Sequence, residues 1–307
     1  MKISSKRSHL VIITIISAIW LFTAFIAPIF APFEFDESEN MIKVITDEGV
    51  WRLYAPHEPS KRHIFGTDRY GYDVFSSLLY GAKYTILTML ITAFLRVFGG
   101  FVIGYYQAMR STIRKRRSSF SLIQGLPIFI IIYFLLFGFI FNPTLSNAAI
   151  TAIQIMLFSL FGLPSTIPVF REKLSIQLKS NFIEAARSSG GGDRWILIHH
   201  VFPHSAEELV IQFTHEIVAT LTLIGQLGVF SVFIGGTVLT TYPTELTSRT
   251  REWGGIIGQN IGKIGSPVWW VLGYPLAAYL LLFFSSLAVS FLIEKKNRKT
   301  YFKASNL

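Results

Sequence analysis

The sequence predicts an all-α, polytopic membrane protein with six transmembrane helices. Of its 307 residues, 51% are hydrophobic and only 15% are charged. The mean hydropathy is +0.48, and soluble domains usually carry about 25% charged residues. In addition, six segments contain the roughly 20 mainly apolar residues that a helix needs to cross the hydrocarbon core. This pattern argues against a water-soluble enzyme and against a disordered chain.

Six long apolar segments are the candidate membrane spans. They occupy residues 9–31, 84–109, 120–141, 148–170, 209–234 and 268–293. Four of the six contain no Asp, Glu, Lys or Arg, whereas the second contains Arg96 and the fifth contains Glu216. The first segment follows basic residues, as in a signal peptide, but it exceeds the roughly 7–15 residues of a signal-peptide core. We therefore expect it to remain in the mature protein as an anchor.

The distribution of basic residues predicts the orientation of the spans. With the N-terminus inside, the inner segments carry 18 Lys and Arg residues and the outer segments carry 9. The inner segments are 1–8, 110–119, 171–208 and 294–307, and the outer ones are 32–83, 142–147 and 235–267. Cytoplasmic loops carry an excess of Lys and Arg. We therefore expect a multi-pass protein of the cytoplasmic membrane with both termini in the cytoplasm.

The net charge of +10 is explained by this topology. The basic run at 114–117 is expected to face anionic lipid. No nucleic-acid recognition fold accompanies the basic clusters, so we expect no nucleic-acid partner.

These assignments divide the chain into four parts. Residues 1–31 hold the cytoplasmic N-terminus and the first transmembrane helix, and residues 32–83 form an extracytoplasmic loop with an interfacial helix. Residues 84–293 form the core domain, with five transmembrane helices and a cytoplasmic loop at 171–208. Residues 294–307 form a basic cytoplasmic tail.

The outer loop at 32–83 is long, and loops beyond about 12–15 residues without structure are usually functional or disordered. Within it, Gly66 and Gly71 flank polar turn formers, and Thr67 or Asp68 can cap the start of a helix. The apolar residues that follow form one stripe of a short helix lying along the outer membrane interface. They are Val74, Phe75, Leu78 and Leu79. The alternative is a linker that only orients the second span.

The cytoplasmic loop at 171–208 predicts a helix, a turn and a second helix. Residues 183–187 suit a helix, and the three glycines at 190–192 must end it because glycine weakens helices and adopts positive φ freely. Asp193 can cap the second helix, which presents Trp195. Because Trp and Arg are typical interface anchors, the loop is a candidate docking surface. The alternative is a loop that only joins two spans.

The same loop resembles the EAA motif of permease subunits of ATP-binding-cassette (ABC) importers. That motif runs Glu-Ala-Ala, three residues, Gly, nine residues, Ile, one residue, Leu-Pro. The residues in register here are Glu184, Ala185, Ala186, Gly190 and Pro203. His200 replaces the usual Ile, and Phe202 replaces the usual Leu. Residues 171–208 are called the coupling loop from here on.

Two further segments resemble the peptide-importer branch of these permeases. The outer loop matches the branch pattern Gly-Thr-Asp-x-x-Gly-Arg-Asp-x-x-Ser-Arg at six positions, called here the outer-loop motif: Gly66, Thr67, Asp68, Gly71, Asp73 and Ser76. Tyr72 and Ser77 stand where Arg is usual, and Glu252-Trp253-Gly254 is similar to a third element. The chain thus resembles the C-type subunit of the dipeptide/oligopeptide permease family. This resemblance implies the six-helix, type I ABC importer architecture.

The resemblance also implies a non-catalytic subunit that moves peptides across the cytoplasmic membrane. Its implied partners are a homologous second permease subunit, two ATP-binding subunits, an extracytoplasmic solute-binding protein and membrane lipid. ATP and Mg²⁺ would bind to the partners, so we expect no cofactor in this chain. The nearest approach to a Walker A loop, at 258–264, is one residue short and lacks the Ser/Thr hydroxyl.

Site residues follow partly from the resemblance and partly from their chemistry. By resemblance, Gly190 permits the turn of the coupling loop and Glu184 holds the loop by hydrogen bonds. The residues expected to contact the ATP-binding subunits are Arg187, Asp193, Arg194 and Trp195. We expect no catalytic and no metal site, because Pro203 interrupts the helical spacing of the nearby histidines and no carboxylate completes a set.

Ionisable residues inside the spans are the candidates for the translocation path, because intramembrane charge is expensive and marks functional sites. They are Arg96, His215 and Glu216. One hypothesis pairs Arg96 with Glu216 across the bundle. The other has each side chain reaching the interface or bonding to backbone carbonyls.

Other functions stay open at this point. The same architecture imports nickel or metallophores in related transporters. An ion-coupled secondary transporter could use Arg96 and Glu216 as relay groups, but the inverted repeats that would favour it are not detected. A membrane enzyme or receptor would need a converging acid–base or metal set, which the outer loops do not offer. The sequence does not identify the cargo.

Overall fold

The computed structural model describes residues 2–46, 49–110, 127–141, 143–241 and 244–304. The longer helices are α1 (Lys2–Phe25), α2 (Val74–Arg110), α3 (Ile128–Ile140), α4 (Asn147–Gln177), α8 (Ala206–Val229) and α10 (Trp270–Ala304). The short helices are α5 (Asn181–Ser188), α6 (Asp193–Ile196), α7 (Phe202–His204) and α9 (Trp253–Asn260). Single turns at Ala27–Phe30, Leu197–Val201 and Ile261–Lys263 are 3₁₀, π and 3₁₀ helices respectively.

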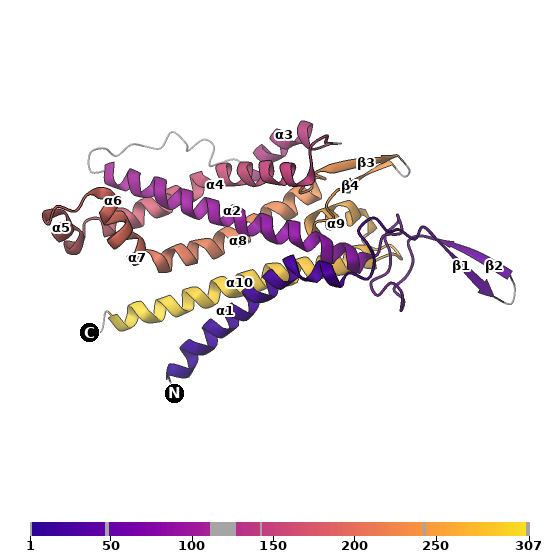
Figure 1. Ribbon diagram of the computed structural model, residues 1–307, viewed down its shortest axis with the longest axis horizontal. Helices are drawn as coiled ribbons and strands as arrows, with labels where there is room; N and C mark the ends of the chain where they lie inside the picture. Colours follow the sequence, from indigo (N-terminus) through magenta and orange to yellow (C-terminus); the bar gives the residue numbers. More distant parts are fainter. Residues whose placement is uncertain (1, 47–48, 111–126, 142, 242–243, 305–307) are drawn as a thin grey trace.

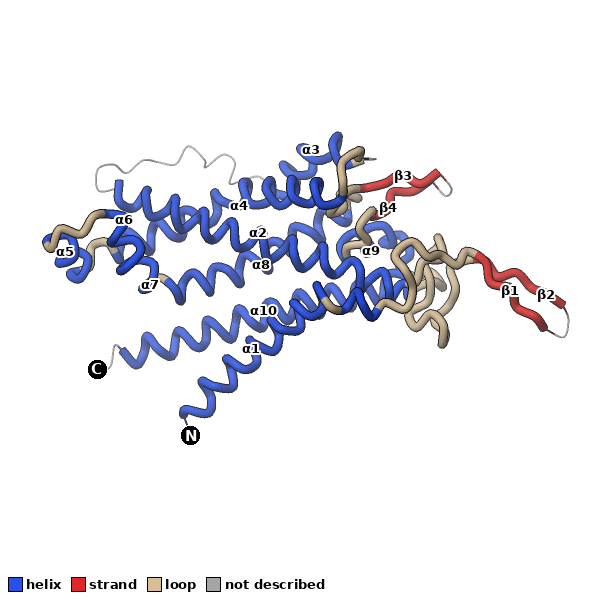
Figure 2. Tube along the Cα trace, viewed as in Figure 1, coloured by secondary structure: helices blue, strands red, loops and turns tan. Residues whose placement is uncertain are grey.

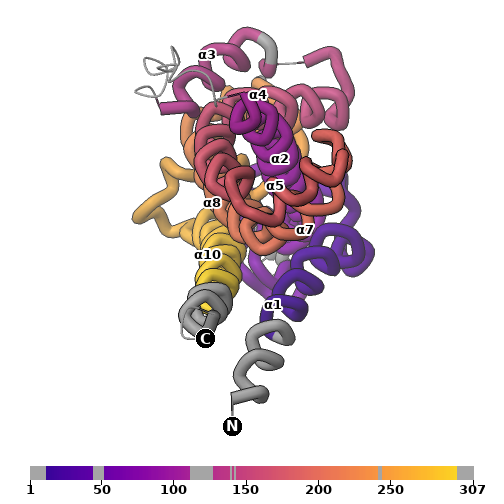
Figure 3. The backbone as a smooth tube through the Cα atoms, turned by 90° about the vertical axis from the view of Figure 1, so that its left-hand side faces the viewer, coloured from indigo at the N-terminus to yellow at the C-terminus, as the bar shows by residue number. Residues whose placement is uncertain are grey.

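The long helices lie along the long axis of the molecule, and the other elements gather at its two ends (Figures 1 and 2). One end carries α5, α6 and α7 together with the start of α1 and the end of α10, and we call it the coupling-loop end. The opposite end carries α9 and two β-hairpins, and we call it the hairpin end. Figure 3 views the molecule from the coupling-loop end, with α5 and α7 in front of the bundle.

Each predicted span overlaps a helix, but the ends of the helices differ, and residues 120–126 of the third predicted span lie outside the described residues. The helix α2 begins at Val74, so the short interfacial helix expected at 74–79 is wrong as a separate element. No proline interrupts this stretch, and Gly81 alone does not end the helix. The helix α10 continues to Ala304, past the expected end of its span at residue 293. The basic run at 114–117 lies outside the described residues.

Two antiparallel hairpins correct the expectation of an all-α fold to a mainly helical one. The strands β1 (Met41–Thr46) and β2 (Gly49–Tyr54) pair with Met41 opposite Tyr54. The strands β3 (Thr237–Thr241) and β4 (Thr244–Ser248) pair with Thr237 opposite Ser248. Their sequences are rich in Val, Ile and Thr, which favour strands. This signal was missed because charged residues and turn formers surround the strands in the outer loops.

Within the described residues, four helices are long and apolar enough to cross a membrane, namely α2, α4, α8 and α10. Two shorter apolar helical segments, Ile12–Phe25 in α1 and Ile128–Gly138 in α3, pack against them. The helix α1 contacts α2 and α10, and α3 contacts α4 and α8. The helix α2 also contacts α4, α8 and α10, so it lies at the centre of the bundle.

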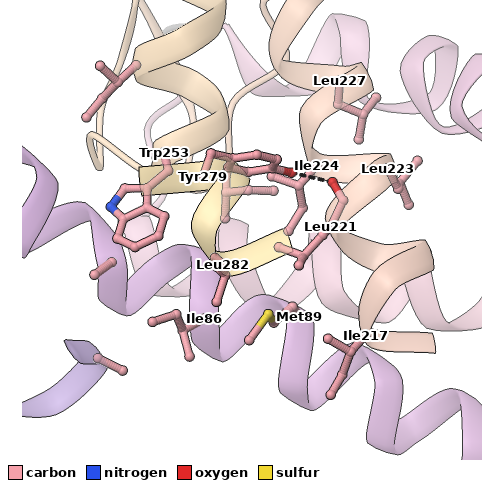
Figure 4. Packing of buried hydrophobic residues seen from close by; sticks show 14 of the residues in the cluster. Ile86, Met89, Ile217, Leu221, Leu223, Ile224, Leu227, Trp253, Tyr279 and Leu282 are labelled. Carbon is pink, nitrogen blue, oxygen red and sulfur yellow. Dashed lines mark hydrogen bonds between the residues drawn. The ribbon is translucent and has the colours of Figure 1, made fainter. Parts of the chain in front are cut away.

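The main hydrophobic core joins α2, α8, α9 and α10 (Figure 4). Ile86 and Met89 of α2 lie opposite Ile217 and Leu221 of α8 in this core. The hydroxyl of Tyr279 on α10 donates a hydrogen bond to the carbonyl of Leu221. That bond satisfies a phenol inside an apolar region, where an unpaired polar group would be destabilising.

Small residues let α2 and α4 approach each other closely. A Cβ on Gly100 would lie 2.5 Å from Oγ1 of Thr166, and one on Gly104 would lie 2.9 Å from Cβ of Phe170. These two glycines form the GxxxG pattern of the second span. Such pairs permit close packing of membrane helices, and here the packing is between helices of one chain.

Candidate functional site

The coupling loop forms two short helices joined by a glycine turn. The helix α5 ends at Ser188, and Gly190 follows with a φ of +88°, a conformation that residues with a Cβ adopt at a cost. The helix α6 then begins at Asp193, with Gly192 in the N-cap position. Asp193 therefore lies in the first turn, where its negative charge interacts favourably with the helix dipole. The expectation that its side chain caps the helix is wrong.

A second hydrophobic core attaches this loop to the bundle. Ile183 of α5 and Ile196 of α6 are fully buried against Phe101 of α2 and Phe170 of α4. The hydroxyl of Tyr105 donates a hydrogen bond of 2.8 Å to the carbonyl of Asp193. The loop is thus packed onto the ends of α2 and α4.

The opposite face of the loop is exposed. Trp195 is 47% exposed, and its ring stacks on His199 with the ring centroids 5.0 Å apart. The other predicted motif residues on this face are Glu184, Ala185, Arg187, Arg194 and Pro203. Ala186 lies on the inner side, and Arg187 reaches back to Met109 of α2. The loop therefore combines a buried apolar face with an exposed face bearing Trp, Arg and acidic groups.

The carboxylate of Glu184 forms no hydrogen bond with any described residue. The helix α5 turns Ile183 and Ala186 towards the bundle and leaves Glu184 on the outside. The hydrogen bonds expected to hold the loop are therefore not made by this side chain within the described chain. Its charge is available to a group outside the chain.

Arg96 and Glu216 form an ion pair in the middle of the bundle. Nη1 of Arg96 donates to Oε2 of Glu216 at 3.1 Å, and the two side chains are 4% and 7% exposed. Nε and Nη2 of Arg96 donate to the carbonyl of Phe158, at 3.0 and 2.8 Å. Gln212 donates to the other oxygen of Glu216. Both hypotheses for Arg96 therefore hold at once, because it binds the carboxylate and a backbone carbonyl.

Gly162 of α4 makes room for this arginine. A Cβ at this position would lie 2.0 Å from Nε of Arg96. The pair thus joins three helices, since Arg96 is on α2, Phe158 on α4 and Glu216 on α8. Gly162 was not predicted, because nothing in the sequence around it indicates that a guanidinium from another helix packs against it.

His215 does not belong with this pair. Its Nε2 lies 2.7 Å from Oε1 of Glu294 on α10, and both side chains are more than 40% exposed. Successive residues of a helix point about 100° apart, so the neighbour of a buried residue can face outward. The structure thus separates His215 from the other two path candidates.

The outer-loop motif forms a compact turn before α2. Oδ2 of Asp73 accepts the N–H of Ser76 at 2.7 Å, and its Oδ1 lies 3.0 Å from Nδ1 of the buried His63. Asp73 thus caps α2. Ser76 accepts the N–H of Phe33, and Thr67 accepts the N–H of His57. The expectation that Thr67 or Asp68 caps the helix is wrong, because the chain turns again before α2 begins.

Asp68 closes the turn within the motif. Its Oδ1 accepts the N–H groups of Tyr70 and Tyr72, both at 2.9 Å. Burial raises the pKa of Asp68 to about 6, and these hydrogen bonds together with the charges of Arg251 and Arg69 partly oppose the rise. Gly66 and Gly71 have φ values of +73° and +79°, as such turns require.

Glu252 caps α9 from a fully buried position. Its Oε2 accepts the N–H of Gly254 at 2.7 Å, and its Oε1 accepts the N–H of Ile234 at 3.4 Å. Burial raises the pKa of Glu252 to about 7, and the backbone N–H groups partly oppose this effect. The carboxyl therefore joins the end of the segment after α8 to the start of α9.

Two structural residues were not singled out from the sequence. Gln154 is buried in α4, where its side chain donates to the carbonyl of Phe233 and accepts the N–H of Gly235. Tyr105 secures the coupling loop. A glutamine inside an otherwise apolar span was a usable signal, since a buried amide needs partners. Nothing local distinguishes Tyr105 from other interfacial tyrosines.

Comparison with known proteins adds to this geometry. A model of the family described as "binding-protein-dependent transport system inner membrane component" matches residues 100–299, about two thirds of the chain. The chain belongs to this family. The predicted resemblance to an importer permease subunit is thereby confirmed, and the matched region contains the coupling loop and Glu216. Arg96 and the outer-loop motif precede the matched region.

Individual relatives of the permease are similar at a lower level of identity. A dipeptide transport system permease protein of Alkalihalophilus pseudofirmus is 27% identical over 70% of this chain and 64% of its own length. A dipeptide transport system permease protein of Haemophilus influenzae is 24% identical over 72% of this chain and 70% of its own length. A glutathione transport system permease protein of Escherichia coli is 26% identical over 66% of this chain and 60% of its own length.

Proposed function

We propose that this chain is a permease subunit of an ABC importer that moves short peptides into the cytoplasm. In this proposal it spans the membrane six times in the type I arrangement, with both termini and the coupling loop in the cytoplasm. It pairs with a homologous second permease subunit. Two ATP-binding subunits hydrolyse ATP with Mg²⁺, and an extracytoplasmic solute-binding protein delivers the peptide. This chain itself is non-catalytic.

The coupling loop is the observation that carries the proposal. Its inner face is packed on α2 and α4, and its outer face presents Trp195 and Arg194. An exposed aromatic ring beside charged groups is typical of the anchors of protein interfaces. In this proposal, a partner that binds the outer face therefore moves α2 and α4. A peptide cargo is supported by the names of relatives that transport dipeptides and glutathione.

The experiment compares two exposed tryptophans at opposite ends of the molecule. Trp195 and Trp269 are 47% and 55% exposed, respectively. The complete transporter is reconstituted in proteoliposomes with its ATP-binding subunits, and ATP-dependent uptake of a labelled tripeptide is measured. We expect Trp195→Ala to lower uptake and to weaken binding of the ATP-binding subunits by about tenfold or more, as removal of an interface anchor does. Trp269→Ala retains subunit binding.

Two results would contradict the proposal. Trp195→Ala with unchanged binding of the ATP-binding subunits would remove the docking role of the loop. Uptake that proceeds without ATP and instead follows an ion gradient would establish a secondary transporter. A matched uptake assay with Ni²⁺ in place of peptide tests the cargo independently of the coupling mechanism.

A further inference from the structure

The hairpin end contains a cavity outside the helix bundle. It has a volume of about 530 Å³ and lies between the outer loop, the β3–β4 hairpin and α9. Sites for small molecules usually measure about 300–1,000 Å³. Its walls come from segments nearly 200 residues apart in sequence, such as Asp68 and Arg251. The cavity is therefore formed by the tertiary structure and is of a size that accepts a small ligand.

Two cross-links hold the walls of this cavity together. The hydroxyls of Tyr70 and Thr240 lie 3.0 Å apart and join the outer-loop motif to β3. Arg69 forms an ion pair with Glu245 and joins the same turn to β4. These contacts connect the turn at 66–73 to the hairpin and hold the walls of the cavity together.

Arg251 lines the cavity, where its positive charge interacts with Asp68 and Asp36 beyond ion-pair distance. Its guanidinium lies 3.8 Å from the ring centroid of Tyr72 and 4.1 Å from that of Phe35. No described carboxylate forms an ion pair with it, although Arg69 beside it has one. Two aromatic faces and a side-chain hydrogen bond with Tyr72 hold the guanidinium in place. Its N–H groups that make no hydrogen bond with the described residues are donors that can bind an anion such as a carboxylate.

The backbone at Arg251 is strained. Its φ is +53°, in a region that non-glycine residues occupy at a cost of about 1–3 kcal/mol. Its carbonyl packs against Gly81 of α2, where a Cβ would lie only 1.8 Å from the oxygen. Strain of this kind persists where the surroundings hold a residue in place and is concentrated at ligand sites.

Ser248 supplies a second observation that points to a ligand. It lines the cavity, is only 8% exposed, and its Oγ has no hydrogen-bond partner among the described residues. Its backbone N–H is satisfied by Gln259. A buried hydroxyl without a partner is destabilising. Because this Oγ is covered, the Ser248 side chain must rotate about χ1 for its hydroxyl to meet a ligand in the cavity.

Negative charge is also present in the wall. Asp68 and the exposed Asp36 line the same cavity as Arg251. A ligand with a single negative charge would therefore meet repulsion as well as attraction. A ligand with one positive and one negative end satisfies both kinds of group. In the cavity it would lie at the end of the molecule opposite the coupling loop (Figure 1).

We propose that this cavity binds a short zwitterionic peptide, with the peptide carboxylate at Arg251 and Ser248 and its ammonium group on the acidic side. The proposal rests on the proposed function and adds to it a peptide site in the permease itself, ahead of the membrane path. Two or three extended residues span about 7–11 Å, which suits a cavity of this size.

The test measures peptide binding to the assembled transporter in lipid nanodiscs, without the solute-binding protein. The probes are trialanine, its C-terminal amide and its N-acetyl form, each titrated by calorimetry. We expect trialanine to bind about tenfold or more tightly than either blocked form, because a charge-assisted hydrogen bond is lost in each case. Arg251→Gln should reduce the preference for acid over amide to less than about twofold, and Ser248→Ala should weaken trialanine binding severalfold.

Control variants separate the site from folding. Arg52→Gln removes an exposed arginine on the β1–β2 hairpin, outside the cavity, and should leave binding unchanged. Arg251→Lys keeps the positive charge and should retain part of the preference for the acid. If both Arg251 variants aggregate, the Ser248→Ala variant provides the test instead.

Three outcomes would overturn the proposal. They are equal binding of trialanine and its amide, no saturable binding at millimolar peptide, and unchanged acid preference in Arg251→Gln. If peptides do not bind but Arg251→Gln weakens association of the solute-binding protein, the cavity is a protein docking site instead. In all of these cases, ATP-dependent peptide uptake by the wild-type transporter would leave the proposed function standing.

Discussion

Arg96 shows what single residues contribute inside the bundle. Its guanidinium is satisfied by Glu216 and by the carbonyl of Phe158, so the charge is paired and hydrogen-bonded. The sequence indicated that both charges were unusual, and the pairing was one of two hypotheses. The sequence also placed His215 among the path candidates, and this stays a prediction. His215 lies apart from the pair, because hydropathy along a helix does not say which way each side chain points.

Removing one partner of this pair should be costly. Glu216→Gln leaves Arg96 without its counter-charge, and we expect a loss of about 3–5 kcal/mol in the free energy of unfolding. The matched control is Glu294→Gln, which breaks the exposed contact with His215 and should cost less than about 1 kcal/mol. Denaturation in detergent micelles measures both, and equal losses would contradict the prediction. The double variant Arg96→Gln/Glu216→Gln should be less destabilised than the sum of the single variants.

The glycine turn offers a second test with a built-in control. Gly190 has a φ of +88°, whereas Gly192 has a φ of −73°, and at either position an added Cβ would meet no atom within 4 Å. Gly190→Ala should therefore destabilise the coupling loop by about 1–2 kcal/mol through backbone conformation alone. Gly192→Ala should have little effect. Hydrogen exchange of the loop amides measures the difference, and identical exchange in the two variants would show that the turn does not need a left-handed residue.

Glu252 predicts a pH dependence of stability. Because its pKa is raised from 4.5 to about 7, the folded protein keeps a proton between these values that the unfolded chain has released. Its contribution to stability is therefore most favourable below pH 4.5, falls as pH rises to about 7 and is constant above that. The whole effect is about 3 kcal/mol. Glu252→Gln should make the melting temperature less dependent on pH between about pH 5 and pH 8. Glu58→Gln, at an exposed site, should leave that pH dependence unchanged.

At the scale of elements, the sequence predicted the long helices well, but it predicted the β-hairpins and the helix boundaries less well. The apolar segments identified the helices, because burial in lipid requires long apolar stretches. The glycines at 190–192 correctly predicted a break between two short helices in the coupling loop. The β-hairpins and the early start of α2 were missed, since polar turn residues in the outer loop obscured the strand pattern and the Asp73 cap. The cavity was not predictable, because its walls are distant in sequence.

The attachment of the coupling loop can be tested with two neighbouring isoleucines. Ile196 is fully buried, while Ile198 is 61% exposed. Ile196→Ala should cost about 2–5 kcal/mol of local packing and loosen the loop. We expect faster trypsin cleavage after Arg187 and Arg194 in this variant, with Ile198→Ala cleaved as slowly as the wild type. Equal cleavage of the two variants would show that the loop is not secured through its inner face.

At the scale of the whole molecule, the structure has two chemically different ends. The coupling loop and the ends of α1 and α10 share one end, and the hairpins occupy the other (Figure 1). The excess of Lys and Arg in the predicted inner segments predicts that the coupling-loop end faces the cytoplasm. The order of the spans along the chain was enough to predict which segments meet at each end, but it did not give the contacts among the helices.

Cysteine labelling can check this orientation, because the chain contains no cysteine. A membrane-impermeant maleimide should label Arg187→Cys only in inside-out vesicles. It should label Tyr54→Cys, at a position 68% exposed on the hairpin, only in right-side-out vesicles. The reverse pattern would place the coupling loop outside the cell, away from ATP.

The uninterrupted length of α2 has a mechanical consequence. The helix measures about 55 Å over its 37 residues, and Arg96 fastens it to two neighbours at a point nearer the coupling loop than the hairpins. About 21 Å of helix lie on one side of that fastening and about 33 Å on the other. If α2 pivots at Arg96, a small tilt imposed at the coupling-loop end moves the far end of α2 in the opposite direction by about half as much again. The turn beside Arg251, which leans on Gly81, is carried with it.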